Sequence, residues 1–298
     1  MRVSSVLFGV VIIVSVISLL CIWAFPSIQD FMASNVTWNG IRDFYREFKA
    51  DNIKSLDRLP GLPEGTTLVV IPCLEYSTEE LAEIRRFAHY GGSLLLMDDY
   101  GHGNSVLEFL DLNIRFTKSP LLDPLFCYKN QQLPKIIDLE PEVKENGINV
   151  VVLNHATTLT DVEQTEVLAW SSETSFLDIN DNGSWDESEP EGPFPIAARA
   201  SFGRGKVTVV SDPGIMINSM LGRDDNYSFI RYLTASQGEQ NSILVDSSHF
   251  EKTTLDASKT WAANAREILS TPYPMLGVVA LIFIVVSRYT LKIGEASG

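Results

Sequence analysis

The chain has 298 residues, a formal net charge of −15 and a pI of about 4.7. A nucleic-acid-binding protein needs a basic face, so this acidity argues against nucleic acid as a partner. The three cysteines, Cys21, Cys73 and Cys127, do not have a metal-binding spacing. A disulfide between Cys73 and Cys127 remains open as the less favoured alternative.

Two apolar segments near the ends of the chain predict transmembrane helices, at residues 6–26 and 272–291. The first contains twenty consecutive residues without a charge, and its apolar core is too long for a cleaved signal peptide. The second reaches a sufficient length when Arg288 extends its charged end toward the membrane surface. We therefore expect a transmembrane helix at each end of the chain.

The basic residues beside these segments predict the orientation of the chain. Arg2 precedes the first segment and Lys292 follows the second, so the positive-inside rule places both short tails, 1–5 and 292–298, in the cytoplasm. Residues 27–271 are then an extracytoplasmic domain of a two-pass cell-membrane protein.

A strand, a helix and a second strand are predicted in succession at the start of this domain. Thr67–Ile71 and Leu94–Met97 are apolar runs without polar alternation, which is typical of strands buried on both faces. Between them, Ser77 and Glu80 form a capping box, and the pair Gly91-Gly92 ends the helix. This order predicts a parallel sheet flanked by helices, the α/β class.

Polar residues follow several predicted strands, and ligands in parallel sheets bind at the carboxyl ends of strands. A hairpin predicted across Phe202–Gly205 and a strand predicted over 242–245 also end in polar residues. His249 follows the second of these. We expect a ligand pocket formed by Glu75, Asp98, Asp99, His155 and Asp212. The alternative is that the aspartates cap backbone N–H groups and that the histidines are structural.

The order of these motifs resembles the class I glutamine amidotransferase-like domain. The matching residues are Gly91, Gly92, Asp98, Asp99, Gly101, Gly103 and Asn104, then Gly205, Lys206, Val207, Val209, Val210 and Asp212, and finally Asp225 and Asn226. The chain is more similar to a membrane-anchored prokaryotic branch of unknown function, related to accessory proteins of gliding-type ABC transport systems. The resemblance covers residues 38–250 and implies a flavodoxin-like sheet.

One departure from this family decides what the resemblance implies about activity. Glutamine amidotransferases place a cysteine in a tight elbow after the central strand, with a histidine–glutamate pair later. Here Asp98 or Asp99 occupies the elbow, and a carboxylate cannot form the required thioester. The resemblance therefore implies the fold and argues against the activity, and no catalytic residue is assigned.

A twelve-residue segment, residues 178–189, matches the calcium-loop pattern at every fixed position. Hard oxygen ligands at this spacing suit Ca²⁺, and Gly183 allows the sharp turn. The predicted ligands are Asp178, Asn180, Asn182, Ser184, Asp186 and Glu189. The flanking segments are not the helices of an EF-hand, so the alternative is a solvated acidic turn.

Taken together, the sequence predicts a non-enzymatic module that binds a ligand or assembles with a membrane complex, such as a transporter. Ca²⁺ is the expected cofactor. The alternative is an extracytoplasmic hydrolase that uses the strand-end carboxylates.

Overall fold

The computed structural model describes residues 3–59, 61, 64–235, 242–269 and 276. Two compact units divide the chain: residues 28–251, called the central unit below, and the two terminal segments. The terminal segments contain helices α1 (Val3–Ala24) and α7 (Thr254–Leu269).

The terminal helices correct the prediction about the membrane. Among the described residues, no helix combines the length and the apolar character that crossing a bilayer requires. The second predicted span, 272–291, lies outside the described residues except for Leu276. The prediction of a transmembrane helix at each end is therefore wrong.

The predicted location in the cell is corrected too, because it depended on these helices. A two-pass position in the cell membrane, cytoplasmic tails and an extracytoplasmic central domain all depended on two spans. With no membrane-spanning helix among the described residues, this localisation is corrected as well.

One eight-stranded sheet runs through the central unit. Its order is β1 (Asp51–Ile53), β14 (Ser242–Asp246), β2 (Thr66–Val70), β3 (Ser93–Met97), β13 (Gly205–Val210), β12 (Pro195–Phe202), β10 (Glu166–Trp170) and β7 (Asp138–Leu139). The first five strands run parallel to one another, and β12, which forms the predicted hairpin with β13, starts the antiparallel part of the sheet that continues through β10 and β7. The predicted α/β class agrees with this mixed sheet, which is parallel over part of its width.

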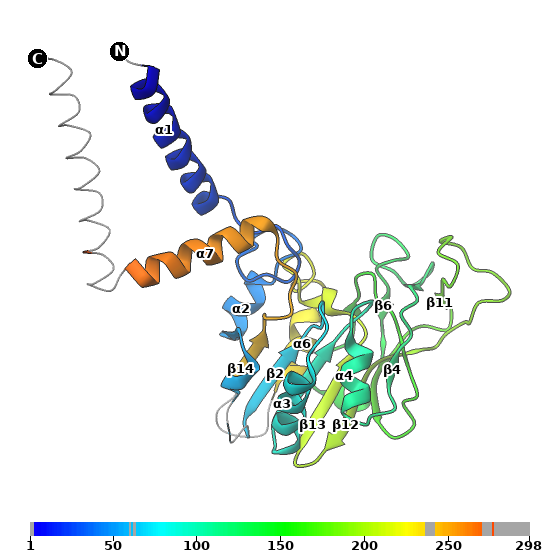
Figure 1. The fold of residues 1–298 in the computed structure, drawn as a ribbon. Coiled ribbons are helices and arrows are strands. Elements are labelled where there is room, and N and C mark those ends of the chain that lie inside the picture. The colour runs from blue at the N-terminus through cyan, green and yellow to red at the C-terminus, as the bar shows by residue number, and fades with distance from the viewer. Residues whose placement is uncertain (1–2, 60, 62–63, 236–241, 270–275, 277–298) are drawn as a thin grey trace, which may run out of the picture. The chain divides into compact units, whose positions relative to one another are not determined.

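The remaining elements cover the sheet or extend its edge. They are the helices α2 (Arg42–Phe48), α3 (Thr78–His89), α4 (Gly103–Phe109), α5 (Pro141–Glu145) and α6 (Asn226–Thr234) and the 3₁₀ turns η1 (Leu56–Arg58) and η2 (Pro213–Met216). Three small antiparallel pairs are β4 (Arg115–Phe116) with β9 (Leu159–Thr160), β5 (Leu121–Leu122) with β11 (Phe176–Leu177), and β6 (Lys135–Ile136) with β8 (Val151–Val152). Figure 1 shows these pairs beyond the antiparallel side of the sheet.

The sheet is buried on both faces, as the apolar strands predict. Successive side chains of a strand point to opposite faces, and in β3 this places Leu95 in one apolar cluster and Leu94 in the other. Helices α2 and α6 pack on the Leu95 face through Phe44 and Phe229. Helices α3 and α4 pack on the Leu94 face, so the parallel strands form the middle layer of three.

Helix α3 begins and ends where its sequence signals predict. The Ser77 side chain accepts from the Glu80 N–H, and the Glu80 carboxylate accepts from the Ser77 N–H at 2.9 Å. Gly91 has a φ of +111°, and a Cβ atom on Gly92 would lie 2.4 Å from the Phe87 ring. Both positions therefore require glycine for the turn into β3.

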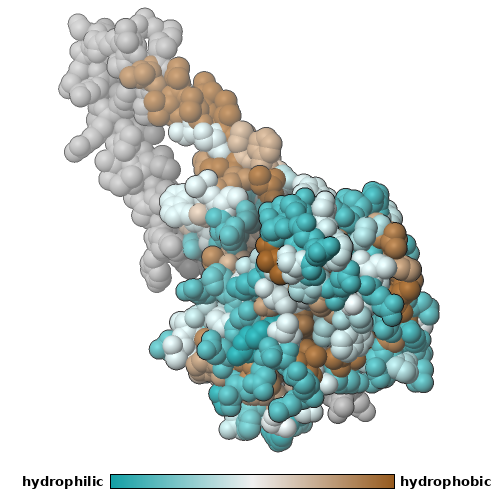
Figure 2. All heavy atoms as spheres, turned by 90° about the vertical axis from the view of Figure 1, so that its right-hand side faces the viewer, coloured by the Kyte–Doolittle hydropathy of each residue, from teal (hydrophilic) through white to brown (hydrophobic). Residues whose placement is uncertain are grey.

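The surface of the central unit is mainly polar. Figure 2 shows one face, which is largely hydrophilic with a few small, separate apolar patches. The most exposed large apolar side chains of this unit include Leu125, Trp38, Ile179 and Trp185.

Candidate functional site

Asp98, directly after β3, is a structural acceptor. Its side chain is only 2% exposed, and its two carboxylate oxygens accept from the N–H groups of Gly101 and Gly103 at 2.8 and 2.7 Å. A Cβ atom on either glycine would lie within 2.7 Å of the same carboxylate. The glycine-rich segment therefore wraps around Asp98. Burial raises the pKa of Asp98 although these hydrogen bonds oppose the shift.

Asp212, directly after β13, has the same kind of role. It is fully buried, and its oxygens accept from the N–H groups of Asn154 and Gly214, both at 2.6 Å. The first bond joins the end of β13 to the segment after β8, and the second caps η2. Burial raises the pKa of Asp212 well above its ordinary value.

Asp99 differs from these two because it is half-buried and faces a cavity. The cavity has a volume of about 290 Å³, and its lining includes Asp30, Cys73, Asp98, Asp99, His102 and Glu251. Burial, and then the nearby charges of Asp98 and Asp30, raise the pKa of Asp99 to about 6. No lysine or arginine of the described part of the chain lines this cavity, although Lys118 donates to the carbonyl of Gly101 in its wall.

Cys73 lies in the same cavity, but its thiol is not activated. Burial, followed by the charges of Asp98 and Asp99, raises its pKa to about 12, so the thiol stays protonated at neutral pH. Cys21, Cys73 and Cys127 are all free in the structure, and the alternative of a Cys73–Cys127 disulfide is wrong.

The other two predicted pocket residues lie elsewhere. Glu75 is exposed, with its carboxylate 3.6 Å from Nδ1 of His102. His155 is exposed, has a left-handed φ of +57°, and follows β8 in a small separate sheet. Of the five predicted residues, Asp98 and Asp99 line the cavity.

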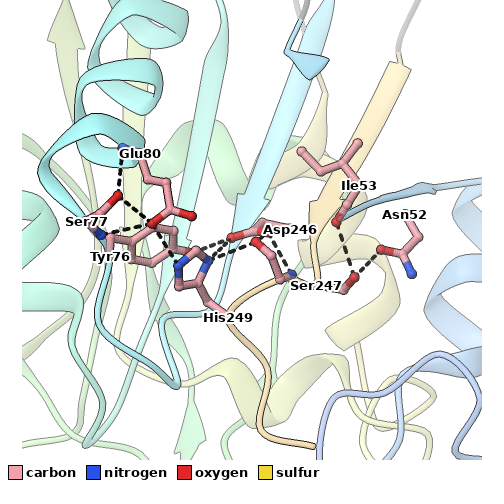
Figure 3. A network of polar contacts seen from close by, with 9 residues as sticks. Asn52, Ile53, Tyr76, Ser77, Glu80, Asp246, Ser247 and His249 are labelled. Carbon is pink, nitrogen blue, oxygen red and sulfur yellow. Dashed lines mark hydrogen bonds and ion pairs between the residues drawn. The ribbon is translucent and has the colours of Figure 1, made fainter. Parts of the chain in front are cut away.

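A largely buried cluster of polar side chains at the end of β14 is the feature that sequence reasoning missed (Figure 3). Nδ1 of His249 lies 2.9 Å from Asp246, and its Nε2 lies 3.4 Å from Glu80. The Tyr76 hydroxyl donates to Asp246 at 2.6 Å, and its ring stacks on the His249 ring at 3.6 Å. Burial acts to raise the pKa of Asp246, but hydrogen bonds from His249, Ser248 and Tyr76 lower it below its ordinary value.

One sequence signal for this cluster exists. Asp246 is the last residue of the apolar strand β14 and His249 follows three residues later, so both lie at the strand end. Glu80 belongs to the capping box of α3, far away in the sequence. Only the fold brings these two local motifs together.

The loop 178–189 is closed by its two outermost carboxylates. Asp178 and Glu189 are 3% and 6% exposed. Asp178 accepts from the N–H groups of Asn182 and Gly183 at 3.0 and 2.8 Å, and Glu189 accepts from Ile179 and Asp186 at 2.8 and 3.1 Å. Gly183 has a φ of +73°, as the sharp turn of the calcium pattern requires.

The donor set of this loop suits a calcium ion, although the side chains are engaged with one another. The side-chain amides of Asn180 and Asn182 both donate to Asp186, at 2.7 and 2.8 Å. Within the described ranges, no three His, Cys, Asp or Glu side chains are grouped as a metal site. Asp178 and Glu189 nevertheless form no ion pair with any described basic residue, so two buried carboxylates lack a cation.

A family model described as "Domain of unknown function (DUF4350)" matches residues 33–234. The chain belongs to the DUF4350 family. This confirms the predicted membership of a family of unknown function, whereas the specific relation to amidotransferases remains a prediction. Comparison with curated proteins gives no match to this DUF4350 chain.

Several solved structures are similar to this DUF4350 chain at low identity. The "mmIFT52 N-terminal domain" is 14% identical with a TM-score of 0.49, over 67% of this chain and 92% of that one. A putative ThuA-like protein from Bacteroides uniformis is 13% identical with a TM-score of 0.41, over 65% and 82%. The cytoplasmic protein STM1381 from Salmonella typhimurium is 14% identical with a TM-score of 0.39, over 62% and 76%. We draw no functional argument from these similarities.

Proposed function

We propose that this DUF4350 chain is a non-enzymatic binding module whose strand-end cavity takes a small cationic ligand. The observation that carries the proposal is the half-buried Asp99, which shares the cavity with Asp30, Asp98 and Glu251. Burial and neighbouring carboxylates raise its pKa to about 6. A bound cation would offset the repulsion and the lost hydration together.

The other polar groups at this edge favour binding over chemistry. Both oxygens of Asp98 and of Asp212 are occupied by backbone N–H groups, so neither side chain is free to transfer a proton. The Cys73 thiol has a pKa of about 12 and is a poor nucleophile. The resemblance to amidotransferase-like domains supports the same proposal, because it comes with a carboxylate in place of the nucleophile. A subunit of a transporter complex remains the partner that this resemblance suggests.

Titration with simple amines tests the cationic ligand. We would add methylamine and putrescine to the full chain at constant ionic strength and pH 7.5, and follow thermal unfolding. Wild type should be stabilised in a saturable way, and Asp99→Asn should lose this effect. Asp111→Asn is the matched control, because it removes one exposed carboxylate outside the cavity. Equal behaviour of all three proteins would refute the proposal.

The same module is proposed to hold a structural Ca²⁺ in loop 178–189. The support is the burial of Asp178 and Glu189 without a described cationic partner, in a loop that fits the calcium pattern. The oxygens of both carboxylates accept backbone N–H groups, and a divalent cation would compensate their negative charge in addition. Asp178, Asn180, Asn182, Asp186 and Glu189 would supply side-chain oxygens, and Ser184 its carbonyl oxygen.

Thermal unfolding with Ca²⁺ and with chelator tests this site. Millimolar Ca²⁺ should raise the Tm of wild type, while Mg²⁺ should have a smaller effect. Glu189→Gln should abolish the Ca²⁺ effect, and Glu187→Gln, an exposed change in the same loop, should retain it. A Tm that is insensitive to Ca²⁺ and to chelator in wild type would remove calcium from the proposal without affecting the amine test.

A hydrolase is the second candidate, and Asp99 is the one observation in its favour. A carboxyl group with a pKa of about 6 in a cavity is suited to general acid–base catalysis near neutral pH. Turnover of chromogenic esters, glycosides or phosphate esters that Asp99→Asn abolishes would favour this candidate over the binding module.

A further inference from the structure

A second, larger cavity lies at the amino-terminal ends of the parallel strands, opposite the Asp99 cavity. Its volume is about 930 Å³, and its lining includes Ser93 at the start of β3 and Lys206 near the start of β13. In the sheet, Lys206 is paired with Ser93 on one side and Ser201 on the other. Directly paired residues share a face, so these three polar side chains lie together on one face of the sheet.

This is the same sheet face that α6 covers farther along the strands. Arg199 shares a face with Ala197, two residues earlier in β12, which belongs to the apolar cluster of α6. Helix α6 ends at Thr234, and its last turn carries Tyr232 at the cavity wall. The apolar core therefore stops at α6, and the cavity begins where polar residues replace it.

Arg199 is the central cation of this cavity. Its side chain is only 15% exposed, and its guanidinium lies 5.1 Å from the centre of the Tyr232 ring. Nη1 approaches Glu142 and Glu166 at 3.9 and 3.4 Å, which are long distances for ion pairs. Nε is buried and has no hydrogen-bond acceptor among the residues that the structure describes.

Lys206 places a second cation in the same cavity. Its Nζ donates to the Ala235 carbonyl at 3.1 Å. Burial lowers the pKa of Lys206, and the positive charge of Arg199 lowers it further, against smaller opposite effects of Glu142 and Glu166. Two partly buried cations thus repel each other, and one of them has an unused, buried donor.

We propose that this cavity binds an oxyanion, a phosphate or sulfate group, between Arg199 and Lys206. Nε of Arg199 and Nζ of Lys206 would donate to its oxygens, and the hydroxyls of Ser93 and Ser201 complete the polar wall. Glu142 and Glu166 contact only Nη1 of Arg199 and leave Nε to the ligand. The site is independent of the proposed cation-binding function, because it uses none of the Asp99 cavity.

The size of the cavity distinguishes two sources of the anion. A free phosphate ion fills only a small part of about 930 Å³, so a phosphate ester has room to make further contacts. We expect glycerol 1-phosphate to bind more tightly than inorganic phosphate by at least about threefold. Equal affinities would assign the site to the free ion, and both results agree with an oxyanion site.

The decisive test observes the Nε–H group of Arg199 itself. Arginine Nε–H signals of the full chain would be recorded by ¹⁵N–¹H NMR during titration with phosphate or sulfate, at constant ionic strength with chloride. The Arg199 signal is assigned by its absence in Arg199→Lys. It should shift saturably, whereas the exposed Arg46 signal should not.

Three variants make the result specific. Lys206→Met should weaken the binding of phosphate at least fivefold, and Lys206→Arg should restore most of it. Arg204→Gln changes a rim cation that already contacts Glu64 and the Tyr90 carbonyl, so its effect should be below twofold. No saturable shift of Arg199 Nε–H, or equal affinities of wild type and Lys206→Met with an unchanged fold, would overturn the proposal.

Discussion

The cavities at the two ends of the same parallel strands differ in the charged residues that line them. At the carboxyl ends, Asp99 and its neighbouring carboxylates face a cavity without lysine or arginine among its described lining residues. At the amino-terminal ends, the larger cavity combines three cations with three carboxylates, namely Arg199, Arg204 and Lys206 with Glu64, Glu142 and Glu166. Burial disfavours the charged form of either sign, so the pKa of Asp99 is raised and that of Lys206 is lowered.

In the cluster at the end of β14, by contrast, hydrogen bonds compensate the burial of a carboxylate. Asp246 is more buried than Asp99, yet its pKa is lowered because His249, Ser248 and Tyr76 donate to it. Burial alone therefore does not decide the direction of the shift. The comparison separates a buried carboxylate that receives several side-chain hydrogen bonds from buried charges whose pKa values are shifted toward the neutral form.

Removing the histidine of the cluster at the end of β14 should have the largest effect. His249→Gln removes the imidazole ring that contacts Asp246 and Glu80, and leaving the buried Asp246 carboxylate without this hydrogen-bond partner should cost about 3 kcal/mol of unfolding free energy. Urea unfolding at pH 7 measures this loss. His102→Gln, which removes an exposed partner of Glu75, is the control and should cost less than about 0.5 kcal/mol.

The pH dependence of the His249→Gln effect has a definite sign. The folded pKa values of Asp246 and Glu80 are lowered, so their contribution to stability is present above the unfolded values near 4. It is lost as the pH falls through the lower folded values. The difference between wild type and His249→Gln should therefore shrink below about pH 4. A difference that grows on acidification would show that the cluster is not stabilised by these charges.

At the uncompensated carboxyl end, removing the charge should stabilise the protein. Asp99→Asn should raise the free energy of unfolding at pH 8 by about 1–3 kcal/mol, since a shift of one pKa unit corresponds to about 1.4 kcal/mol. The gain should disappear as the pH falls through about 6 toward 4, where the Asp99 carboxyl is protonated in both states. Asp111→Asn, the exposed control, should change stability by less than about 0.5 kcal/mol at either pH. Destabilisation by Asp99→Asn at pH 8 would contradict the comparison.

At the amino-terminal end, removing a positive charge should also stabilise the protein, but by a smaller amount. Lys206→Met keeps the length of the side chain and removes a cation whose folded pKa is lowered, so it should stabilise by up to about 1 kcal/mol at pH 7. The lost hydrogen bond to Ala235 limits this gain. The gain should fall toward pH 10, where lysine loses its charge in the unfolded chain as well. Lys144→Met, on the exposed side of α5, is the matched control, and equal effects of both variants would refute the assignment.

The sequence predicts those parts of the fold that depend on local signals. The Ser77–Glu80 capping box, the glycines before β3 and the β12–β13 hairpin are each encoded within a few residues, and all three are present. The transmembrane prediction depended on the apolar length of the terminal segments, which the described helices do not provide. A count of apolar residues therefore proved less reliable than caps and turns.

The candidate sites were predictable only in part. Asp98 and Asp99 were placed at the strand end, but the hydrogen bonds that separate their roles depend on how residues 101–103 fold back. Glu80 and His249 are far apart in sequence, so neither motif alone reveals their contact. The Arg199 cavity exists because α6 ends before it covers the sheet, which no local pattern specifies.

The most direct test of this account is the pKa of the Asp99 carboxyl group in the full chain. Its ¹³C carboxyl signal, assigned by comparison with Asp99→Asn, would be followed by NMR between pH 3 and pH 8. The account predicts a midpoint of about 6 in the absence of ligand, which saturating amine lowers toward the ordinary value. A midpoint near 4 without ligand would mean that the cavity already compensates Asp99, and the proposed contrast between the two ends of the sheet would be wrong.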